Sequence, residues 1–143
     1  NSMSKEFILK KLEQMKTLIG ELASLAGLSF SDFKNKFTNI RSAERNFQLI
    51  IELASDINAH ISAERGLPAP DTYRESFAQM IKIGVLPEKL RNDFIKSSNL
   101  RNILIHEYDF DEDNFIFYKS LKKSIPLYQD YILFIHNYLD KLK

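Results

Sequence analysis

The chain has 143 residues, a formal net charge of +1 and no cysteine. These values are typical of a single globular domain with one hydrophobic core. The lack of cysteine excludes disulfide bonds and thiolate metal sites and fits a cytoplasmic protein, and no run of about 18 apolar residues could cross a membrane. A net charge so close to zero excludes a nucleic-acid binder that depends on overall positive charge, so any contact with RNA needs a local site.

One domain is expected over residues 3–143, because no repeat, low-complexity tract or linker interrupts the chain. Asn1 and Ser2 precede Met3 and are interpreted as the remnant of a tag. Long segments with a helical period of apolar residues lie between the few glycines and prolines. This pattern predicts an all-α fold.

The predicted elements follow in chain order. Long helices are expected at about Ser4–Ala26, Asn39–Arg65, Pro87–His106 and Asp109–Leu142, a short helix at about Thr72–Ile83, and a loop with one helical turn over Ser29–Phe37. Gly27, Gly66 and Gly84 should end the helices before them, and Pro87 suits the first turn of the next one. Acidic residues favour the start of the last helix, which Pro126 should kink. The predicted architecture is a bundle of four long helices and one short helix.

The stretch RNILIHEY (Arg101–Tyr108) carries polar residues that a helix core would not need. On a helical wheel, Arg101, Asn102, His106 and Tyr108 gather on one arc, with only Ile105 among them. Asn102 and His106 are four residues apart, so their side chains can touch. The stretch is therefore a candidate functional site.

The residue types of this arc suit the cleavage of a phosphodiester. The guanidinium of Arg101 is a planar fork of donors that matches a phosphate, and the imidazole of His106 can give or take a proton near neutral pH. Asn102 could fix the imidazole tautomer or bind a phosphate oxygen. RNA brings its own nucleophile, the 2′-hydroxyl, so cleavage needs no metal, and no dense cluster of metal ligands is visible. No cofactor is expected.

The same spacing also has a simpler interpretation. A polar arc beside isoleucine and leucine is a normal property of an amphipathic helix, and its residues are usually solvated. From spacing alone, this interpretation is the commoner one, and the two stay open.

A wider resemblance favours the functional interpretation. The ERGL loop at Glu64–Leu67, the helix start GVLPE at Gly84–Glu88 and the R-x4-H-x-Y pattern at Arg101–Tyr108 follow one another in the order seen in the HepT-like branch of the HEPN superfamily. The resemblance covers roughly Ile40 to Leu142, and the pattern residues show no departure from the family.

This resemblance implies a fold, an activity and a partner. HepT-like proteins are small all-helical, dimeric toxins with a metal-independent ribonuclease site. Arg101 would bind the scissile phosphate, and His106 would be the acid/base residue. The antitoxin of this family is a minimal nucleotidyltransferase that transfers AMP to the tyrosine of the pattern, which here is Tyr108. An AMP group there would block the substrate phosphate by volume and by charge.

Two polar residues of the second predicted helix could support this site. Asn58 lies in its apolar stripe, so its amide needs a partner, which is either a core group or the helix that carries Arg101. Asp56 could orient Arg101.

The remaining candidates have simpler expected roles. His60 and His136 are interpreted as residues of amphipathic faces. The aromatic residues of the last helix are expected in the core or an interface rather than in base stacking; they are Phe115, Phe117, Tyr118, Tyr128, Tyr131, Phe134 and Tyr138. Lys119, Lys122 and Lys123 form a basic spot that is either a solvated face or a guide for RNA.

Two functions compete on these observations. The first is a ribonuclease toxin acting on RNA through Arg101 and His106, silenced by AMP transfer to Tyr108. The second is a non-enzymatic helical subunit that binds a nucleotide or the active site of a nucleotidyltransferase. The complete R-x4-H-x-Y pattern favours the first, because a scaffold has little need of the histidine.

Overall fold

A computed structural model describes residues 2–99 and 110–142, and every regular element in these ranges is a helix. Three long helices are present: α1 (Ser2–Ala26), α3 (Phe37–Glu64) and α7 (Phe110–Lys141). The shorter elements are α2 (Phe30–Asn35), α4 (Tyr73–Lys82), the 3-10 turn η1 (Glu88–Leu90) and α5 (Arg91–Ser98). The all-α prediction is therefore confirmed.

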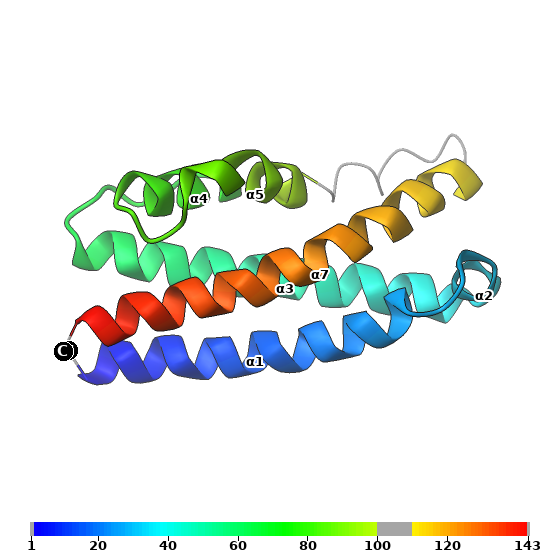
Figure 1. Ribbon diagram of the computed structural model, residues 1–143, viewed down its shortest axis with the longest axis horizontal. Helices are drawn as coiled ribbons and strands as arrows, with labels where there is room; N and C mark the ends of the chain where they lie inside the picture. The colour runs from blue at the N-terminus through cyan, green and yellow to red at the C-terminus, as the bar shows by residue number, and fades with distance from the viewer. Residues whose placement is uncertain (1, 100–109, 143) are drawn as a thin grey trace.

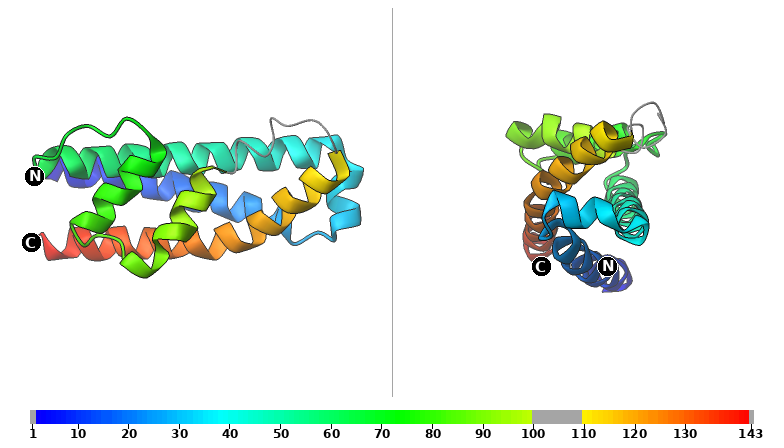
Figure 2. Two further views of the ribbon diagram at one scale, coloured as in Figure 1. Left: turned by 90° about the horizontal axis from the view of Figure 1, so that it is seen from above. Right: turned by 90° about the vertical axis from the view of Figure 1, so that its right-hand side faces the viewer.

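The three long helices run along the long axis of the molecule, α4 and α5 cover one side of them, and α2 lies at one end of the bundle (Figure 1). Helix α1 packs against both α3 and α7. On the opposite side, α4 packs on α3 and α5 packs on α7, and the two short helices also contact each other. Figure 2 shows α4 and α5 lying obliquely across the space between α3 and α7. The core is thus enclosed by α1 below and by α4 and α5 above.

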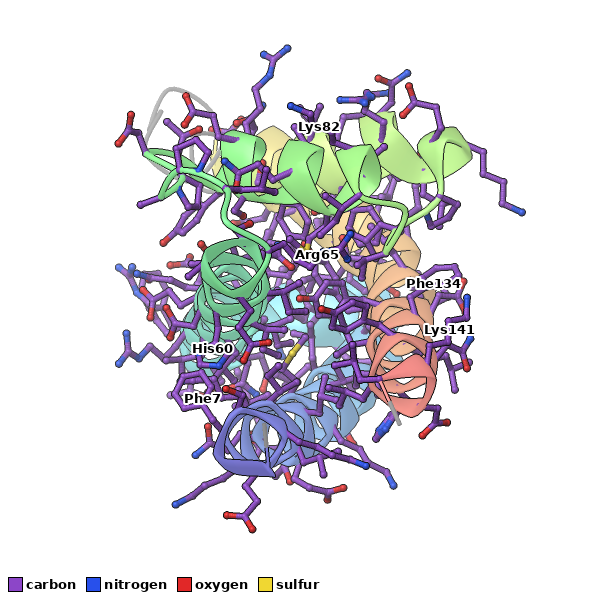
Figure 3. The ribbon with its side chains drawn as sticks, turned by 90° about the vertical axis from the view of Figure 1, so that its left-hand side faces the viewer. Phe7, His60, Arg65, Lys82, Phe134 and Lys141 are labelled. Atoms are coloured by element: carbon purple, nitrogen blue, oxygen red, sulfur yellow. The ribbon has the colours of Figure 1, made fainter. Side chains whose placement is uncertain are left out.

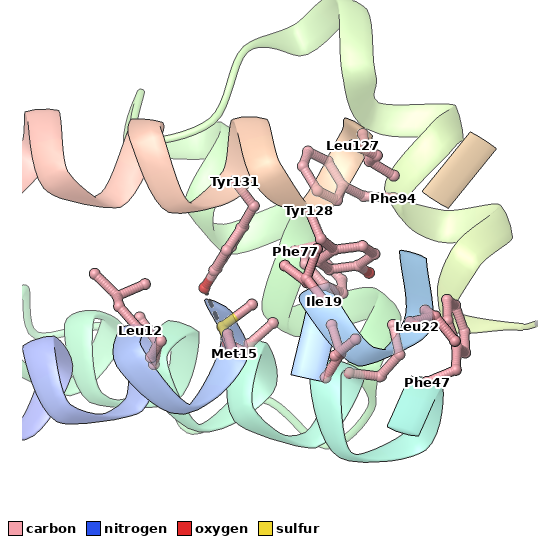
Figure 4. Packing of buried hydrophobic residues seen from close by; sticks show 14 of the residues in the cluster. Leu12, Met15, Ile19, Leu22, Phe47, Phe77, Phe94, Leu127, Tyr128 and Tyr131 are labelled. Carbon is pink, nitrogen blue, oxygen red and sulfur yellow. Dashed lines mark hydrogen bonds between the residues drawn. The ribbon is translucent and has the colours of Figure 1, made fainter. Parts of the chain in front are cut away.

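The core is built from apolar stripes with a helical period. On α1, Leu12, Met15, Ile19 and Leu22 recur every three or four residues, and all are buried. They face the aromatic rings of α4, α5 and α7 in the middle of the bundle (Figure 4). Four of these rings, from Phe77, Phe94, Tyr128 and Tyr131, contact one another with centroids 5.1 to 6.4 Å apart. The expectation that α7 contributes aromatic residues to the core is confirmed.

Glycines and hydroxyl residues set several helix ends. Gly66 and Gly84 follow α3 and α4 with φ of 73° and 80°, a left-handed conformation in which a side chain would strain the backbone. Thr72 opens α4 because its hydroxyl accepts a hydrogen bond from the backbone N–H of Glu75 at 3.0 Å. The predicted helix stops at both glycines are confirmed.

The fourth predicted helix differs from the expectation. The segment after Pro87 begins with the 3-10 turn η1, and α5 ends at Ser98. Ser97 and Ser98 donate their hydroxyl protons to the carbonyl oxygens of Phe94 and Ile95, both at 2.7 Å. Such bonds compete for carbonyls that a continuing helix would use. The described part of this segment is therefore the turn η1 followed by the eight-residue α5, and the rest of it, from residue 100 to His106, lies outside the described residues.

Helix α7 agrees with its prediction at both ends. It begins at Phe110, inside the acidic stretch, and continues without interruption through Pro126 to Lys141. The axis of α7 changes direction in its orange middle part, as expected for a helix that contains a proline (Figure 1). In the parts of the chain that the structure describes, no helix has the length and hydropathy to cross a bilayer.

Candidate active site

The residues of the R-x4-H-x-Y pattern lie outside the described residues. Their convergence on one site therefore stays a prediction for Arg101, Asn102, His106 and Tyr108. The structure does fix the two helices that flank them in the chain. Helix α5 ends at Ser98, and α7 begins at Phe110.

The end of α5 is anchored firmly to the core. Phe94 is fully buried and stacks on Phe77 with centroids 5.1 Å apart. One turn later, the Ser97 hydroxyl lies 2.6 Å from the phenol oxygen of Tyr128 on α7. Burial raises the pKa of Tyr128, so the phenol keeps its proton and can donate it to Ser97, whose own proton goes to the Phe94 carbonyl. The backbone that leads into the pattern thus starts from a fixed position.

A groove of about 850 Å³ lies between α5 and α7, next to this anchor. We call it the α5–α7 groove, and its lining residues are Asp93, Lys96, Ser97, Asn99, Ser120, Lys122, Lys123, Ser124, Pro126 and Leu127. Of the described residues, three lysines and one carboxylate line it, and their formal charges sum to +2. Positive charge is therefore concentrated here, although the whole chain carries only +1.

The lysines of this groove differ by one residue from the basic spot predicted from the sequence. Lys122 and Lys123 belong to the predicted basic spot, and Lys96 joins them from α5. Lys119 instead places its ammonium over the ring of Phe115, 5.3 Å from the centroid. The link between Lys96 and the two lysines of α7 could not be read from their spacing, because it depends on how α5 packs on α7.

Asn58 proves to be a satisfied core amide. Its side chain is fully buried, and its oxygen accepts a hydrogen bond from the phenol of Tyr131 at 2.6 Å. Its amide nitrogen donates to the hydroxyl of Ser76 on α4 at 3.2 Å. The dashed line from Tyr131 in Figure 4 points into this part of the core, where α7 meets α3. Asn58 thus ties α3 to α4 and α7.

Asp56 lies on another face of α3. Its carboxylate is exposed and accepts a hydrogen bond from the ammonium of Lys11 on α1 at 3.3 Å. Its proposed contact with Arg101 involves a residue outside the described ranges and stays a prediction. The ion pair with Lys11 joins α1 to α3 at the surface, where such pairs contribute little stability.

The two other histidines have no catalytic neighbourhood among the described residues. His60 stacks on Phe7 with ring centroids 4.7 Å apart, and Figure 3 shows the two side chains together. The Nε2 atom of His60 lies 3.3 Å from a Glu64 carboxylate oxygen, but the angle does not suit a hydrogen bond. His136 is half-buried on α7. Both agree with residues of amphipathic faces.

A second hollow of about 410 Å³ lies at the end of the bundle where α3 and α7 finish. Arg65 and Lys141 reach it from the two helices, and Phe134 contributes to its wall (Figure 3). Within residues 2–99 and 110–142, no cluster of three or more histidine, aspartate or glutamate residues could hold a metal ion.

Comparison with known proteins identifies the protein family of this chain. The family model described as "Ribonuclease HepT-like" matches residues 8–135, which include the whole R-x4-H-x-Y pattern. The chain therefore belongs to the HepT-like ribonuclease family. The family prediction made from the sequence is confirmed.

Two relatives with known activities are similar to this chain in sequence. A tRNA nuclease HepT from Aphanizomenon flos-aquae is 31% identical over 133 residues, which cover 93% of this chain and 90% of that protein. An mRNA nuclease HepT from Shewanella oneidensis is 30% identical over 103 residues, which cover 72% of this chain and 77% of that protein. Both relatives are nucleases, which agrees with the predicted enzyme class.

Solved structures share the fold as well. A chain from a crystal structure of the toxin–antitoxin MntA–HpeT, in a mutant form, matches with a TM-score of 0.81 and 26% identity, over 92% of this chain and 98% of that chain. A chain from the structure of the tri-AMPylated Shewanella oneidensis HEPN toxin in complex with the MNT antitoxin gives 0.78 and 26%, over 92% and 97%. The predicted HEPN-type fold is confirmed, and these neighbours are toxin–antitoxin assemblies.

Proposed function

We propose that this protein is the ribonuclease toxin of a toxin–antitoxin pair and that it cleaves RNA without a metal ion. The observation that carries the proposal is the complete R-x4-H-x-Y pattern at Arg101–Tyr108 in a chain of the HepT-like ribonuclease family. Relatives that are named as tRNA and mRNA nucleases support RNA as the substrate.

The proposed reaction uses the 2′-hydroxyl of RNA as the nucleophile. A base removes its proton, the oxygen attacks the adjacent phosphorus, and an acid returns a proton to the departing 5′-oxygen. The products are a 2′,3′-cyclic phosphate and a free 5′-hydroxyl. His106 serves as the acid/base residue, Arg101 neutralises the crowded phosphate, and Asn102 and Asp56 support these two side chains.

A homodimer would explain how one signature histidine per chain serves two proton transfers. A two-fold axis beside the pattern would bring two copies of His106 into one cleft. Dimers that mix wild-type and His106→Ala subunits test this point. If a mixed dimer, with one wild-type subunit, keeps half of the activity of the wild-type dimer, the two sites are independent.

Control of the toxin is proposed to act at Tyr108. A cognate minimal nucleotidyltransferase in the same cytoplasm would transfer AMP from ATP to its phenol, with release of pyrophosphate. The AMPylated state of the Shewanella toxin in complex with its antitoxin supports this step. Co-expression with the neighbouring gene and an intact mass of the product would reveal whole AMP units, and Tyr108→Phe should remain unmodified.

Purified variants test the catalytic assignment. His106→Ala should lose at least 100-fold in RNA cleavage, since general acid–base catalysis contributes about 10²–10⁴-fold. Arg101→Ala should lose about 10²–10³-fold, the usual cost of removing a group that stabilises charge in the transition state. His136→Gln is the matched control, because His136 is a half-buried residue far along α7. Wild-type cleavage should persist in a metal chelator. Full cleavage by either catalytic variant would defeat the assignment.

The competing function is a non-enzymatic subunit that binds a nucleotidyltransferase. Growth distinguishes the two functions, because expression without the partner is harmful only if the protein cuts RNA. The nuclease relatives favour the enzyme.

A further inference from the structure

We propose that the α5–α7 groove binds the sugar–phosphate backbone of single-stranded RNA next to the cleaved bond. This inference rests on the proposed ribonuclease function and adds a substrate subsite formed by Lys96, Lys122 and Lys123. The described lining residues of the groove come from α5, its C-cap Asn99 and α7, and none of them belongs to the R-x4-H-x-Y pattern.

Chain connectivity places the groove close to the catalytic arginine. Asn99 lines the groove, and Arg101 follows it by two residues. Two trans peptide units hold their outer Cα atoms within about 7.6 Å of each other, whatever the backbone conformation. A phosphate bound by Arg101 is therefore within reach of a strand that continues into the groove.

The amines of the groove are available for a ligand. Neither Lys96 nor Lys123 forms an ion pair or hydrogen bond through its ammonium with any described residue. The ammonium of Lys122 lies over the Tyr118 ring, 4.8 Å from the centroid, and this contact does not neutralise its charge. Among the described lining residues, Asp93 supplies one carboxylate against three lysines, so two positive charges are in excess.

Helix stabilisation explains only part of this arrangement. Lys96 lies in the last turn of α5, where a cation offsets the partial negative charge of the helix end. Lys122 and Lys123 lie in the interior of the 32-residue α7, where the helix ends exert little field. Their convergence with Lys96 on one groove therefore favours an anionic ligand.

The lining suits a nucleic-acid backbone rather than bases. None of the described residues that line it is aromatic, so these residues offer no platform for base stacking. Its serines and Asn99 can bind phosphate oxygens or the 2′-hydroxyl, and its lysines supply sequence-independent attraction. The part of α7 from Ser120 to Leu127 spans about 10 Å, which is short against the roughly 34 Å of a duplex turn. A short length of single strand fits this surface.

RNA affinity measured against salt tests the groove directly. The groove variant combines Lys96→Gln, Lys122→Gln and Lys123→Gln in a His106→Ala background, which prevents cleavage during the measurement. The matched control removes the same charge from exposed lysines on α1 and α4; its changes are Lys10→Gln, Lys16→Gln and Lys82→Gln.

Counterion release sets the expected size of the effect. Each phosphate contact to a single strand contributes about 0.7 to the slope of log affinity against log salt, so the groove variant should lose about two units of slope. At 0.1 M salt this corresponds to a loss of affinity of about 100-fold for a ten-nucleotide RNA. The loss should be equal for uridine-rich and adenosine-rich strands. Replacing the same three lysines with arginine should restore binding.

A dinucleotide provides an internal control in the cleavage assay. It carries only the scissile phosphate. The wild type and a protein with the three groove substitutions but an intact His106 should therefore cleave it at equal rates. The ten-nucleotide RNA should be cleaved with a higher KM by the groove variant and with a similar kcat, because lost uniform binding raises KM alone.

The outcomes separate this inference from the proposed function. Equal salt slopes for the groove variant and the control would overturn the groove assignment while wild-type cleavage upholds the ribonuclease. Normal RNA binding with a lost antitoxin complex would also overturn it and assign the groove to the protein partner. If the wild type cleaves no RNA, the proposed enzyme fails, and the binding measurement alone decides whether the groove holds RNA.

Discussion

Removing one buried hydroxyl should weaken the whole bundle, because Tyr131 joins α7 to α3 through Asn58. The Tyr131 phenol donates to the Asn58 amide oxygen at 2.6 Å, and both side chains are fully buried. It also lies 3.1 Å from the Ala54 carbonyl, but that oxygen keeps its helical partner when the phenol is removed. In Tyr131→Phe, the Asn58 oxygen therefore loses its partner in a place that water does not reach.

The expected cost of Tyr131→Phe is about 1–3 kcal/mol, the penalty for a buried polar group left without a partner. With a urea m-value of about 2 kcal/mol/M, a loss of about 2 kcal/mol lowers the unfolding midpoint by about 1 M. Circular dichroism at one fixed protein concentration measures this shift. The fixed concentration is necessary because a dimer would make stability concentration-dependent.

Two further variants make the test specific. Tyr138→Phe, on the same helix, removes a half-buried phenol that has no hydrogen bond to a described residue, and it should change stability by less than about 0.5 kcal/mol. The double variant Tyr131→Phe with Asn58→Leu should lose less than the sum of the single variants, because both polar partners are absent together. If Tyr131→Phe unfolds at the wild-type midpoint, the described role of Asn58 is wrong.

Three other predictions concern helix ends and buried phenols. Gly84→Ala should destabilise the protein by about 1–2 kcal/mol because φ is 80° at this position. Gly20→Ala should stabilise it by up to about 1 kcal/mol, because Gly20 lies inside α1 and an added Cβ would have no atom within 4 Å. Urea midpoints that move in the same direction for both variants would contradict this. Thr72→Ala should cost about 0.5–2 kcal/mol by removing the cap of α4, and Thr72→Ser should retain most of that stability. Because burial raises the pKa of Tyr128 in the folded state, the contribution of this group to stability should be constant below about pH 10 and fall above it by about 1.4 kcal/mol per pH unit. Tyr128→Phe should reduce that slope, and an unchanged slope would refute the assignment.

Much of the fold could be predicted because apolar periodicity and helix-end residues act locally. The boundaries of α1, α3 and α4 follow from stripes such as Leu12–Met15–Ile19 and from Gly66 and Gly84. The short α5 was not foreseen. At its end the hydroxyls of Ser97 and Ser98 bond the carbonyl oxygens of Phe94 and Ile95, and the Ser97 hydroxyl also contacts the phenol of Tyr128. Those two residues are separated by 31 positions in the chain. Competition between a side chain and the helix backbone becomes decisive only after the packing is known.

The candidate site also has a part that could be predicted from the sequence and a part that could not. The R-x4-H-x-Y pattern is a contiguous set of residues, so the sequence alone is enough to identify the family and to propose roles for Arg101 and His106. Asn58 also lies on one recognisable stripe, but its two partners come from α4 and α7, and no local rule could select Ser76 and Tyr131.

The groove shows most clearly why surface function escapes a single-helix analysis. Lys122 and Lys123 are neighbours in sequence and suggest only an exposed face, while Lys96 by itself suggests a helix end. Their shared surface exists because Phe94 and Ser97 fix α5 against α7, and that anchor is made by aromatic packing and one buried hydroxyl pair. The same contacts hold the chain at Asn99, two residues before Arg101, for which we propose a catalytic role. One anchor therefore fixes both Asn99, from which the chain continues to the R-x4-H-x-Y pattern, and the basic wall of the groove. If the proposed site and groove act on the same RNA, a change that loosens the Ser97–Tyr128 pair should impair RNA binding and cleavage together.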